Sequence, residues 1–334
     1  MKLEKIWDEL LRTEPKRGEG LLRRRLLPEG AIDLFAAVKK PANTRLLQLT
    51  FRTALPSGTQ MPECRGLLLS VKEESDGAFL LSIAPASALF EDLYALLCDS
   101  LVTKVETLRD EGAATRAIAA ELQRWQHFLE SVGPEGLSTE GQQGLFGELK
   151  LLETCLGLGP PDPLVRGWTG PGRGLHDFEF PGVICEVKTV SGKAPSRIYI
   201  PSEKQLDPRQ GETLLYCLAL TVNRSFGVTL VDAVERLRKA ILIAPEAAHA
   251  FEDGLFRWGY LDIHAPLYGD RRYLCSEEMF FRVGAGFPCL TSTDIPDGVG
   301  DVHYSITLDA CRPFSLTLDQ GREILAKGLE HVRG

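Results

Sequence analysis

One twelve-residue stretch, from Asp177 to Lys188, constrains the fold of this chain more than any other part of its sequence. It covers most of two runs of strand-forming residues, 176–180 and 183–190, which are separated by Pro181 and Gly182. A proline–glycine pair between two such runs is typical of a tight β-hairpin turn. The stretch therefore predicts two antiparallel strands that lie side by side.

This hairpin would bring two carboxylates and one lysine to the same place. Residues two apart in a strand share a face, so Glu186 and Lys188 point the same way. Cys185 and Val187 then point into the opposite layer. The turn folds Asp177 back toward the first pair. Carboxylate oxygens are preferred ligands of Mg²⁺, and Lys188 would be placed to act on a metal-bound water and on the transition state of phosphodiester hydrolysis.

A third carboxylate is expected on the helix that precedes the hairpin. Thr139 and Gln142 have the capping-box spacing that marks the start of a helix. The apolar stripe of this helix consists of Leu145, Leu149, Leu152 and Leu156. Glu148 lies about 70° from the centre of that stripe, at the margin of the face that should pack against the sheet. From there it could reach the sheet edge and hold a second metal ion or a metal-bound water.

The remaining patterns predict a mixed α/β protein with more than one domain. The length of 334 residues suggests two domains, or three if one is small. Strand-like and helix-like runs are mixed after residue 139, which predicts a mixed β-sheet core flanked by helices. The expected segments are a β-rich N-terminal module (1–110), a helical connector (111–140), the core (141–226) and an α+β C-terminal region (227–334). The expected elements are a helix at 3–11, a basic loop, strands at 31–38, 45–52, 66–71 and 77–83, two helices between 87 and 132, strands at 197–201 and 213–222, and helices at 229–243 and 247–258.

Charge limits how the chain could bind nucleic acid. Lys and Arg total 38 against 46 Asp and Glu, a formal net charge of −8, so such binding needs a local basic surface. Arg23, Arg24 and Arg25, together with Lys16 and Arg17, form one candidate cluster. These side chains could bind DNA phosphates, or they could belong to a solvated loop that balances nearby acids.

Cysteine usage and hydropathy indicate the compartment. The eight cysteines are scattered without a CxxC pair, which argues against a structural zinc site and fits a reducing environment. No apolar run reaches the roughly 20 residues that a membrane span needs. We therefore expect a cytoplasmic protein with no membrane partner.

Glu148, Asp177 and the run Glu186-Val187-Lys188 follow one another along the chain. Their order resembles that of the PD-(D/E)XK nuclease superfamily, in which an acidic residue on a helix precedes Asp and then (D/E)-X-K on the next strand. More specifically, the chain is similar over most of its length to a prokaryotic family of PD-(D/E)XK proteins. The strings that carry this similarity are Gly144-Leu-Phe-Gly-Glu148, Trp168-Thr-Gly-Pro171, His176-Asp-Phe178, Glu186-Val-Lys-Thr189, Ser202-Glu-Lys-Gln-Leu-Asp207, Ile295-Pro-Asp-Gly-Val299 and Tyr304-Ser-Ile306.

The resemblance implies a restriction-endonuclease-like fold and a Mg²⁺-dependent deoxyribonuclease, in which Mn²⁺ could substitute. It implies DNA as the substrate, a role in restriction or defence against foreign DNA, and other defence subunits or further copies of the chain as partners. His176 stands where the superfamily motif has proline, and this departure leaves the following aspartate unchanged. The implied catalytic residues are Glu148, Asp177, Glu186, Lys188 and Gln205, and the implied metal-binding positions are Asp177, Glu186, Val187 and Glu148.

Simpler interpretations stay open for several of these residues. An E-x-K on a strand can be an exposed ion pair, and Glu148 can be a solvated helix residue. Gln205 could be a loop amide that satisfies a turn, and His176 a structural hydrogen-bonding residue at a strand start. The glycine-rich run 167–174 could cradle a phosphate or form a turn packed by Trp168. The alternative function is a non-catalytic DNA-binding or scaffold subunit that keeps the nuclease fold, and a third candidate is a repair or recombination nuclease.

Overall fold

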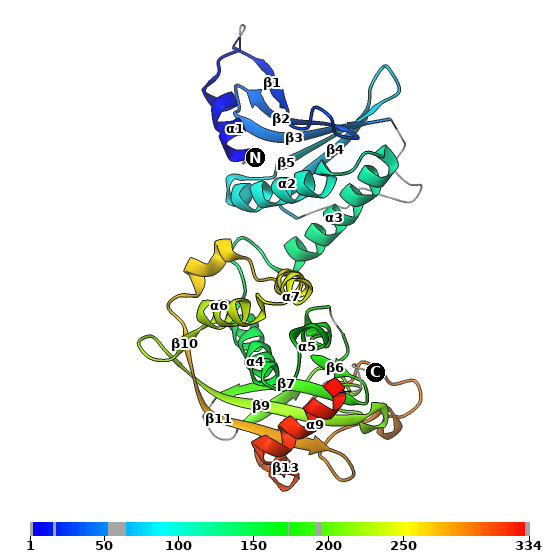
Figure 1. Cartoon of the computed structure of the whole chain (residues 1–334), viewed down its shortest axis with the longest axis vertical. Coiled ribbons are helices and arrows are strands. Elements are labelled where there is room, and N and C mark those ends of the chain that lie inside the picture. The colour runs from blue at the N-terminus through cyan, green and yellow to red at the C-terminus, as the bar shows by residue number, and fades with distance from the viewer. Residues whose placement is uncertain (1–2, 16–17, 53–64, 173, 192–195, 331–334) are drawn as a thin grey trace. The chain divides into compact units, whose positions relative to one another are not determined.

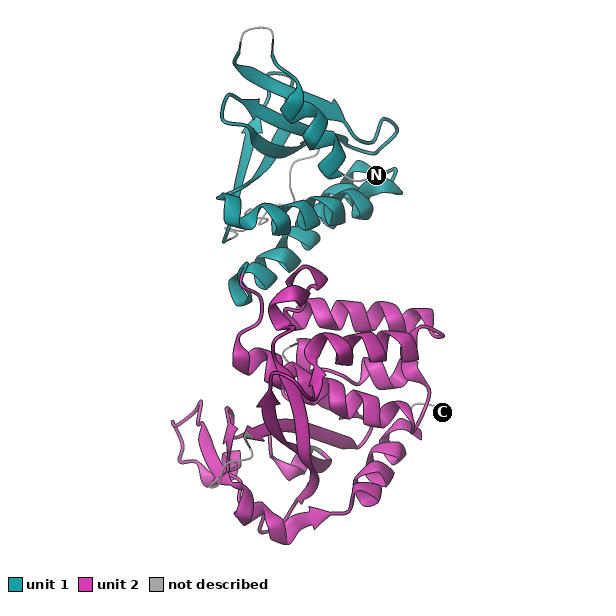
Figure 2. Cartoon of the chain, turned by 90° about the vertical axis from the view of Figure 1, so that its left-hand side faces the viewer, with its two compact units in different colours: residues 1–134 teal, residues 135–334 magenta. Residues whose placement is uncertain are grey.

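The computed structural model of this chain describes residues 3–15, 18–52, 65–172, 174–191 and 196–330. Lys16 and Arg17 of the predicted basic cluster lie outside the described residues. The chain divides into two compact units, residues 1–134 and 135–334 (Figure 2). No described helix is both long enough and apolar enough to cross a membrane.

The first unit is an antiparallel sheet with helices packed against it. Its elements are α1 (Leu3–Arg12), β1 (Gly20–Arg25), β2 (Asp33–Lys40), β3 (Thr44–Phe51), β4 (Leu67–Glu73), β5 (Phe79–Pro85), α2 (Glu91–Glu106) and α3 (Glu111–Ser131). The strand order is β1-β2-β3-β5-β4. Helix α1 packs on β2 and helix α2 on β5, and the fully buried rings of Trp7 and Tyr94 join these helices with their centroids 5.4 Å apart. This unit therefore has its own core.

The predicted basic loop is wrong, because Arg23, Arg24 and Arg25 lie in strand β1 and pair with β2. All six residues of β1 are exposed or half-buried, so the strand lacks the apolar–polar alternation that would identify it in the sequence. Strand β1 lies at the edge of the sheet, and it forms because its backbone pairs with that of β2.

The second unit is built on a mixed sheet of order β10-β11-β9-β7-β6, with β13 beside β11 (Figure 1). Strands β7 and β9 are parallel, and the other neighbouring pairs are antiparallel. The strands are β6 (Phe178–Phe180), β7 (Val183–Ser191), β8 (Arg197–Ile200), β9 (Glu212–Asn223), β10 (Val228–Thr229), β11 (Arg272–Val283), β12 (Tyr304–Thr307) and β13 (Ser315–Leu316). The helices are α4 (Thr139–Leu156), α5 (Pro161–Arg166), α6 (Leu230–Ile241), α7 (Pro245–Trp258), α8 (Leu308–Cys311) and α9 (Leu318–Glu330). This arrangement confirms the predicted mixed α/β class.

Two different layers cover the faces of this sheet. Helices α4 and α9 lie on one face, α5 and α6 pack against α4, and α7 packs against α5 and α6 (Figure 1). The opposite face is covered by the two-stranded β8–β12 sheet and the segments next to it. The buried cluster on that face includes Val190, Ile198, Leu215, Phe281 and Ile306.

The hairpin that was predicted around Pro181 and Gly182 is confirmed. Phe180 pairs with Val183 directly across the turn. Gly182 has a φ of +77°, a conformation that glycine adopts without the steric cost of a side chain. The sequence at this turn therefore sets the register of β6 against β7.

Other predicted elements differ from the structure in their partners or limits. The strand expected at 197–201 exists as β8, but it pairs with β12 rather than joining the central sheet. Helix α4 is capped by Ser138, whose side chain accepts from the Gly141 N–H, and not by Thr139. The segment between α4 and the hairpin contains the short helix α5, which was not predicted.

The structure has two compact units, whereas four segments were expected from the sequence. Helix α3 falls in the first unit, and the expected core and C-terminal region fall together in the second. The second grouping has a direct cause, because β11 pairs with β9 over most of its length. The C-terminal region is therefore part of the sheet that carries the site.

Candidate active site

The hairpin places Asp177 at the open edge of strand β7. Phe178 pairs with Cys185, and Asp177 comes immediately before the three-residue strand β6. Its Oδ2 accepts a hydrogen bond from the main-chain N–H of Val187 at 2.8 Å. The aspartate side chain thus takes the place of a strand partner where β6 has ended.

Glu186 and Lys188 lie on β7 and contact each other through Glu186 Oε1 and Lys188 Nζ. Glu186 is fully buried, whereas the side chain of Lys188 is 18% exposed. Val187 points toward the other side of the sheet, where α4 packs. Lys188 is therefore the member of this pair whose side chain solvent can reach.

Glu148 is brought to β7 by a close approach of helix α4. A Cβ on Gly147 would lie 2.6 Å from Thr189 Cγ2, so glycine allows the helix to pack this tightly. Glu148 is 6% exposed, and its Oε2 accepts hydrogen bonds from the indole N–H groups of Trp168 at 2.7 Å and Trp258 at 2.9 Å. Trp258 was not identified from the sequence, because it lies 110 residues away from Glu148 and no local pattern connects the two.

Gly170 separates the carboxylates of Glu148 and Asp177. A Cβ on this glycine would lie 2.7 Å from Glu148 Oε2 and 3.2 Å from Asp177 Oδ1. The Gly170 N–H donates to the carbonyl of Asp177 at 3.0 Å, which holds the backbone in this position. Both carboxylates therefore lie against one residue that has no room for a side chain.

The three carboxylates share a buried, electrostatically unfavourable environment. Burial and the charge of Asp177 raise the pKa of Glu186 to about 8, although Lys188 opposes this shift. Burial and Asp177 also raise the pKa of Glu148, and its two indole donors oppose the change. Burial raises the pKa of Asp177, against the opposing effect of Lys188. Burial raises the pKa of all three acids and Asp177 raises that of both glutamates further, so they form the kind of cluster that a cation would stabilise.

The pKa of Lys188 is also shifted upward. Burial lowers it, but the charges of Glu186 and Asp177 outweigh burial, so the net pKa is raised. Lys188 is therefore held as an ammonium beside the acids and is not prepared to act as a general base.

The donor set fits a hard divalent cation that keeps several water ligands. Glu186 Oε2 is buried and has no hydrogen-bond partner in the described part of the chain. Within the described ranges, no three side chains of His, Cys, Asp or Glu are gathered closely enough to hold a metal by themselves. Mg²⁺ is usually bound through one or two carboxylates, with water completing its shell. Asp177 and Glu186 can provide such a pair.

Gln205 and His176 form no hydrogen bond to the three carboxylates among the described residues. The Gln205 N–H donates to the carbonyl of Ser202 at 3.1 Å, and its side-chain Oε1 is buried without a partner in the described chain. His176 is buried, with Nδ1 3.2 Å from Glu179 Oε1. The structure thus gives His176 a structural contact, while the proposed role of Gln205 remains a prediction.

Each arginine of the predicted DNA-binding cluster has a neighbour within the first unit. The contacts are Arg23 with the ring of Phe35 at 4.7 Å from its centroid, Arg24 with Glu9, and Arg25 with Asp33. The two ion pairs are about half exposed, and exposed pairs of this kind contribute little to stability. These arginines therefore remain available for phosphates.

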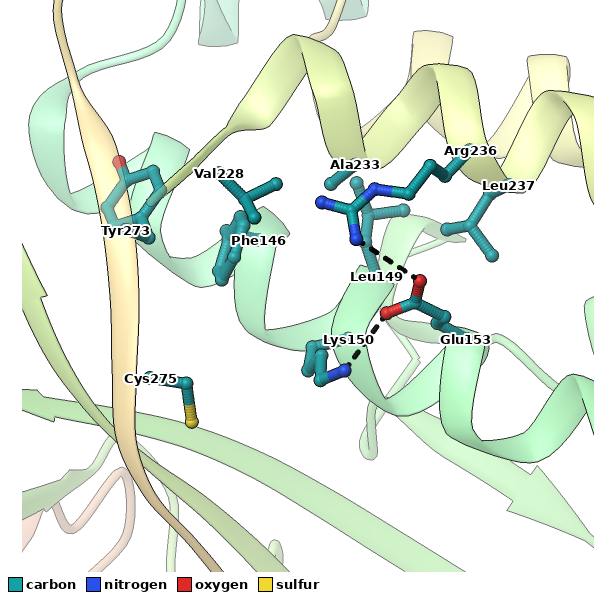
Figure 3. Close-up of a pocket in the computed structure, with 10 residues that line it drawn as sticks. All are labelled: Phe146, Leu149, Lys150, Glu153, Val228, Ala233, Arg236, Leu237, Tyr273 and Cys275. Atoms are coloured by element: carbon teal, nitrogen blue, oxygen red, sulfur yellow. Dashed lines mark hydrogen bonds and ion pairs between the residues drawn. The ribbon is translucent and has the colours of Figure 1, made fainter. Parts of the chain in front are cut away.

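Two cavities of the second unit have different linings. A cavity of about 320 Å³ borders Trp168 and is lined by Arg166 of α5 and Arg257 of α7. Another of about 130 Å³ lies between α4, α6 and β11, with Glu153 paired to two cations at its edge (Figure 3). None of the predicted catalytic residues lines either cavity, and the first is connected to the carboxylates only through Trp168, whose indole N–H donates to Glu148.

Comparison with known proteins identifies the family. No curated protein and no solved structure matches the chain. A family model described as "Putative PD-(D/E)XK family member" (DUF4420) matches residues 3–309, which is nearly the whole chain. This match confirms the resemblance carried by the acidic and lysine motifs, and the chain belongs to this PD-(D/E)XK family.

Proposed function

We propose that this protein is a divalent-metal-dependent nuclease that hydrolyses phosphodiester bonds in DNA, on a restriction-endonuclease-like core formed by the second unit. The observation that carries the proposal is the convergence of Glu148, Asp177, Glu186 and Lys188 at the open edge of β7. Burying several carboxylates together destabilises a folded protein unless a cation or a function compensates. The family described above supports the nuclease assignment.

Each residue of the site has a proposed role that follows from its position. Asp177 and Glu186 would hold Mg²⁺ or Mn²⁺, with Glu148 and the main chain of Val187 as further proposed positions. The bound ion would polarise the phosphate and make a bound water more acidic. Lys188 has a partly exposed side chain, and its ammonium would hold the attacking water and stabilise negative charge on the phosphate as the bond breaks. Gln205 would support the site from the turn after β8.

Positive charge in the cavity that borders Trp168 supports a polyanionic substrate. Arg166 and Arg257 line the 320 Å³ cavity that borders Trp168, whose indole bonds to Glu148. Arg166 is paired with Glu246 and Arg257 with Asp253, in exposed pairs that phosphates can exchange. We assign DNA as the substrate and restriction or defence as the role, with other defence subunits or further copies of the chain contributing recognition.

The test is metal-dependent cleavage by wild type and two site variants. Wild type with Mn²⁺ is expected to cut at least one of single-stranded, double-stranded or methylated DNA. Lys188→Ala should lower the cleavage rate by about 10²–10³ and retain metal binding, because the ammonium acts on the reaction and not on the ion. Asp177→Asn should lose both properties.

Lys150→Ala is the matched control, since it removes a lysine that pairs with Glu153 on α4 outside the carboxylate cluster. Its cleavage rate should equal that of wild type. Cleavage by Lys188→Ala at the wild-type rate would contradict the proposed function.

The second candidate function is a non-catalytic DNA-binding or scaffold subunit. The observation that favours this candidate is that, within the described ranges, no three side chains of His, Cys, Asp or Glu form a ready metal site. Calorimetric titration with Mn²⁺ separates the two functions, because a scaffold has no need to bind the ion at Asp177 and Glu186.

A further inference from the structure

The carboxylate of Glu148 is held through one oxygen by two tryptophans. Trp168 and Trp258 both direct their indole N–H groups to Oε2, at 2.7 and 2.9 Å. An indole can only donate, so both bonds require the acceptor that the carboxylate provides. Neither bond uses Oε1, which is left as the oxygen that a further ligand can engage.

Both indoles are themselves fixed by close packing. The Trp168 ring lies 5.7 Å from the Phe251 ring, and a Cβ on Gly254 would come within 2.8 Å of Trp168. A Cβ on Gly144 would lie 3.2 Å from the ring of Trp258. Donors that are held this way fix the rotation of the carboxylate they bind.

A second buried glutamate, Glu121, also accepts an indole hydrogen bond, but its charge is balanced by an arginine. Glu121 accepts from the Trp125 indole at 3.1 Å and also forms an ion pair with Arg124 at 3.2 Å. Glu148 is also buried, but it forms no ion pair among the described residues, and Lys188 already contacts Glu186. Its carboxyl group is thus oriented by two indoles but has no cationic partner in the described ranges.

We propose that Trp168 and Trp258 are positioning residues that hold Glu148 ready for a divalent cation or for a water bound to it. The proposal rests on the proposed metal-dependent function. It makes α7, which carries Trp258, part of the site. Interactions that orient a metal ligand typically change metal affinity by about 10–100-fold when they are removed.

Trp168→Phe and Trp258→Phe test the proposal in the full chain, because phenylalanine keeps an aromatic ring and removes the N–H donor. Each variant should bind Mn²⁺ at least about 10-fold more weakly than wild type in calorimetric titration. Trp125→Phe is the matched control, since it removes an indole–carboxylate bond in the first unit and should leave Mn²⁺ affinity unchanged. Wild-type Mn²⁺ affinity in both site variants would overturn the proposal.

A double-mutant cycle covers the case in which a tryptophan variant is simply unstable. In a Glu148→Ala background, Trp258→Phe should cause no further loss of Mn²⁺ affinity, because no carboxylate remains to be oriented. A further loss of about 10-fold there would mean that the indole acts by another route and would overturn the proposal. Mn²⁺ binding tests the tryptophans and DNA cleavage tests the nuclease, so wild type that binds Mn²⁺ without cutting DNA would refute only the proposed function.

Discussion

The buried carboxylate of Glu186 makes the stability of the metal-free protein depend on pH. Burial and Asp177 raise its pKa from 4.5 to about 8 in the folded, metal-free protein. Between these values the folded state binds more protons than the unfolded state, so stability falls as pH rises. Glu186→Gln should therefore raise the melting temperature of the metal-free protein more at pH 8 than at pH 5.

Thermal unfolding in the presence of a chelator measures this difference. Glu140→Gln, at an exposed position at the start of α4, is the control and should match wild type at both pH values. An equal gain from Glu186→Gln at pH 5 and pH 8 would show that the acid does not take up a proton on folding.

The sequence predicted those site residues whose positions depend on local geometry. Strand alternation places Glu186 beside Lys188, and the turn at Pro181 brings Asp177 back to them. Trp258 could not be predicted, because its contact with Glu148 depends on the packing of α7 against α4 across the whole second unit. Long-range contacts of this kind leave no periodic signal in a single sequence.

Helix α4 and strand β7 can approach each other only because Gly147 lacks a side chain. Gly147→Ala would place a Cβ 2.6 Å from Thr189 Cγ2 and 3.3 Å from Val187 Cγ1. Overpacking of this kind costs about 1–3 kcal/mol, more than the helix propensity that alanine adds. We expect lower stability and weaker Mn²⁺ binding, because Glu148 is the next residue on the helix.

Chemical denaturation and Mn²⁺ titration measure both effects. Gly141→Ala is the control in the same helix, since its nearest neighbour would be Ser138 Oγ at 3.5 Å, and it should be neutral or slightly stabilising. Adding Thr189→Ser to Gly147→Ala should recover part of the loss by removing the clashing methyl group. If the double variant recovers no stability, the contact with the Thr189 methyl group is not the source of the strain.

Some helices and strands could be predicted from the sequence and others could not. The β6–β7 hairpin was predicted because its turn residues specify it, and α6 begins with a capping box of Thr229 and Asp232 that marks its start. Strand β1 was missed because its partner β2 defines it. Strand β8 was found, but its pairing with β12 depends on residues about 100 positions later, which an isolated strand pattern cannot reveal.

The second unit contains the whole candidate site and a core of its own. Glu148, Asp177, Glu186, Lys188 and both positioning tryptophans belong to residues 135–334. The sheet, α4 and α9 bury its apolar side chains independently of the first unit. A fragment of residues 135–334 should therefore fold, bind Mn²⁺ like the full chain and retain cleavage. A fragment that folds but does not bind Mn²⁺ would contradict this assignment.

The two units also differ in what their arginines would contribute to DNA binding, since the chain is acidic overall and binding must be local. Replacing Arg23, Arg24 and Arg25 with alanine should weaken binding equally for all DNA sequences. The slope of log K against log salt should fall by about 0.9 for each arginine–phosphate interaction that the substitutions remove. The cleavage rate at saturating DNA should stay unchanged, because these residues belong to the unit that lacks the carboxylates.

Arg257→Ala should differ, because Arg257 lines the cavity that borders Trp168, whose indole N–H donates to Glu148. An arginine there would position the strand for reaction, so its loss should lower both DNA affinity and the rate at saturating DNA. Arg312→Ala, which removes an exposed arginine paired with Asp309, is the control and should change neither quantity. Fluorescence anisotropy over a range of salt concentrations and single-turnover cleavage measure the two effects separately. If the triple variant keeps wild-type affinity and salt dependence, Arg23, Arg24 and Arg25 serve only to balance nearby acids, and the DNA contacts lie on the second unit.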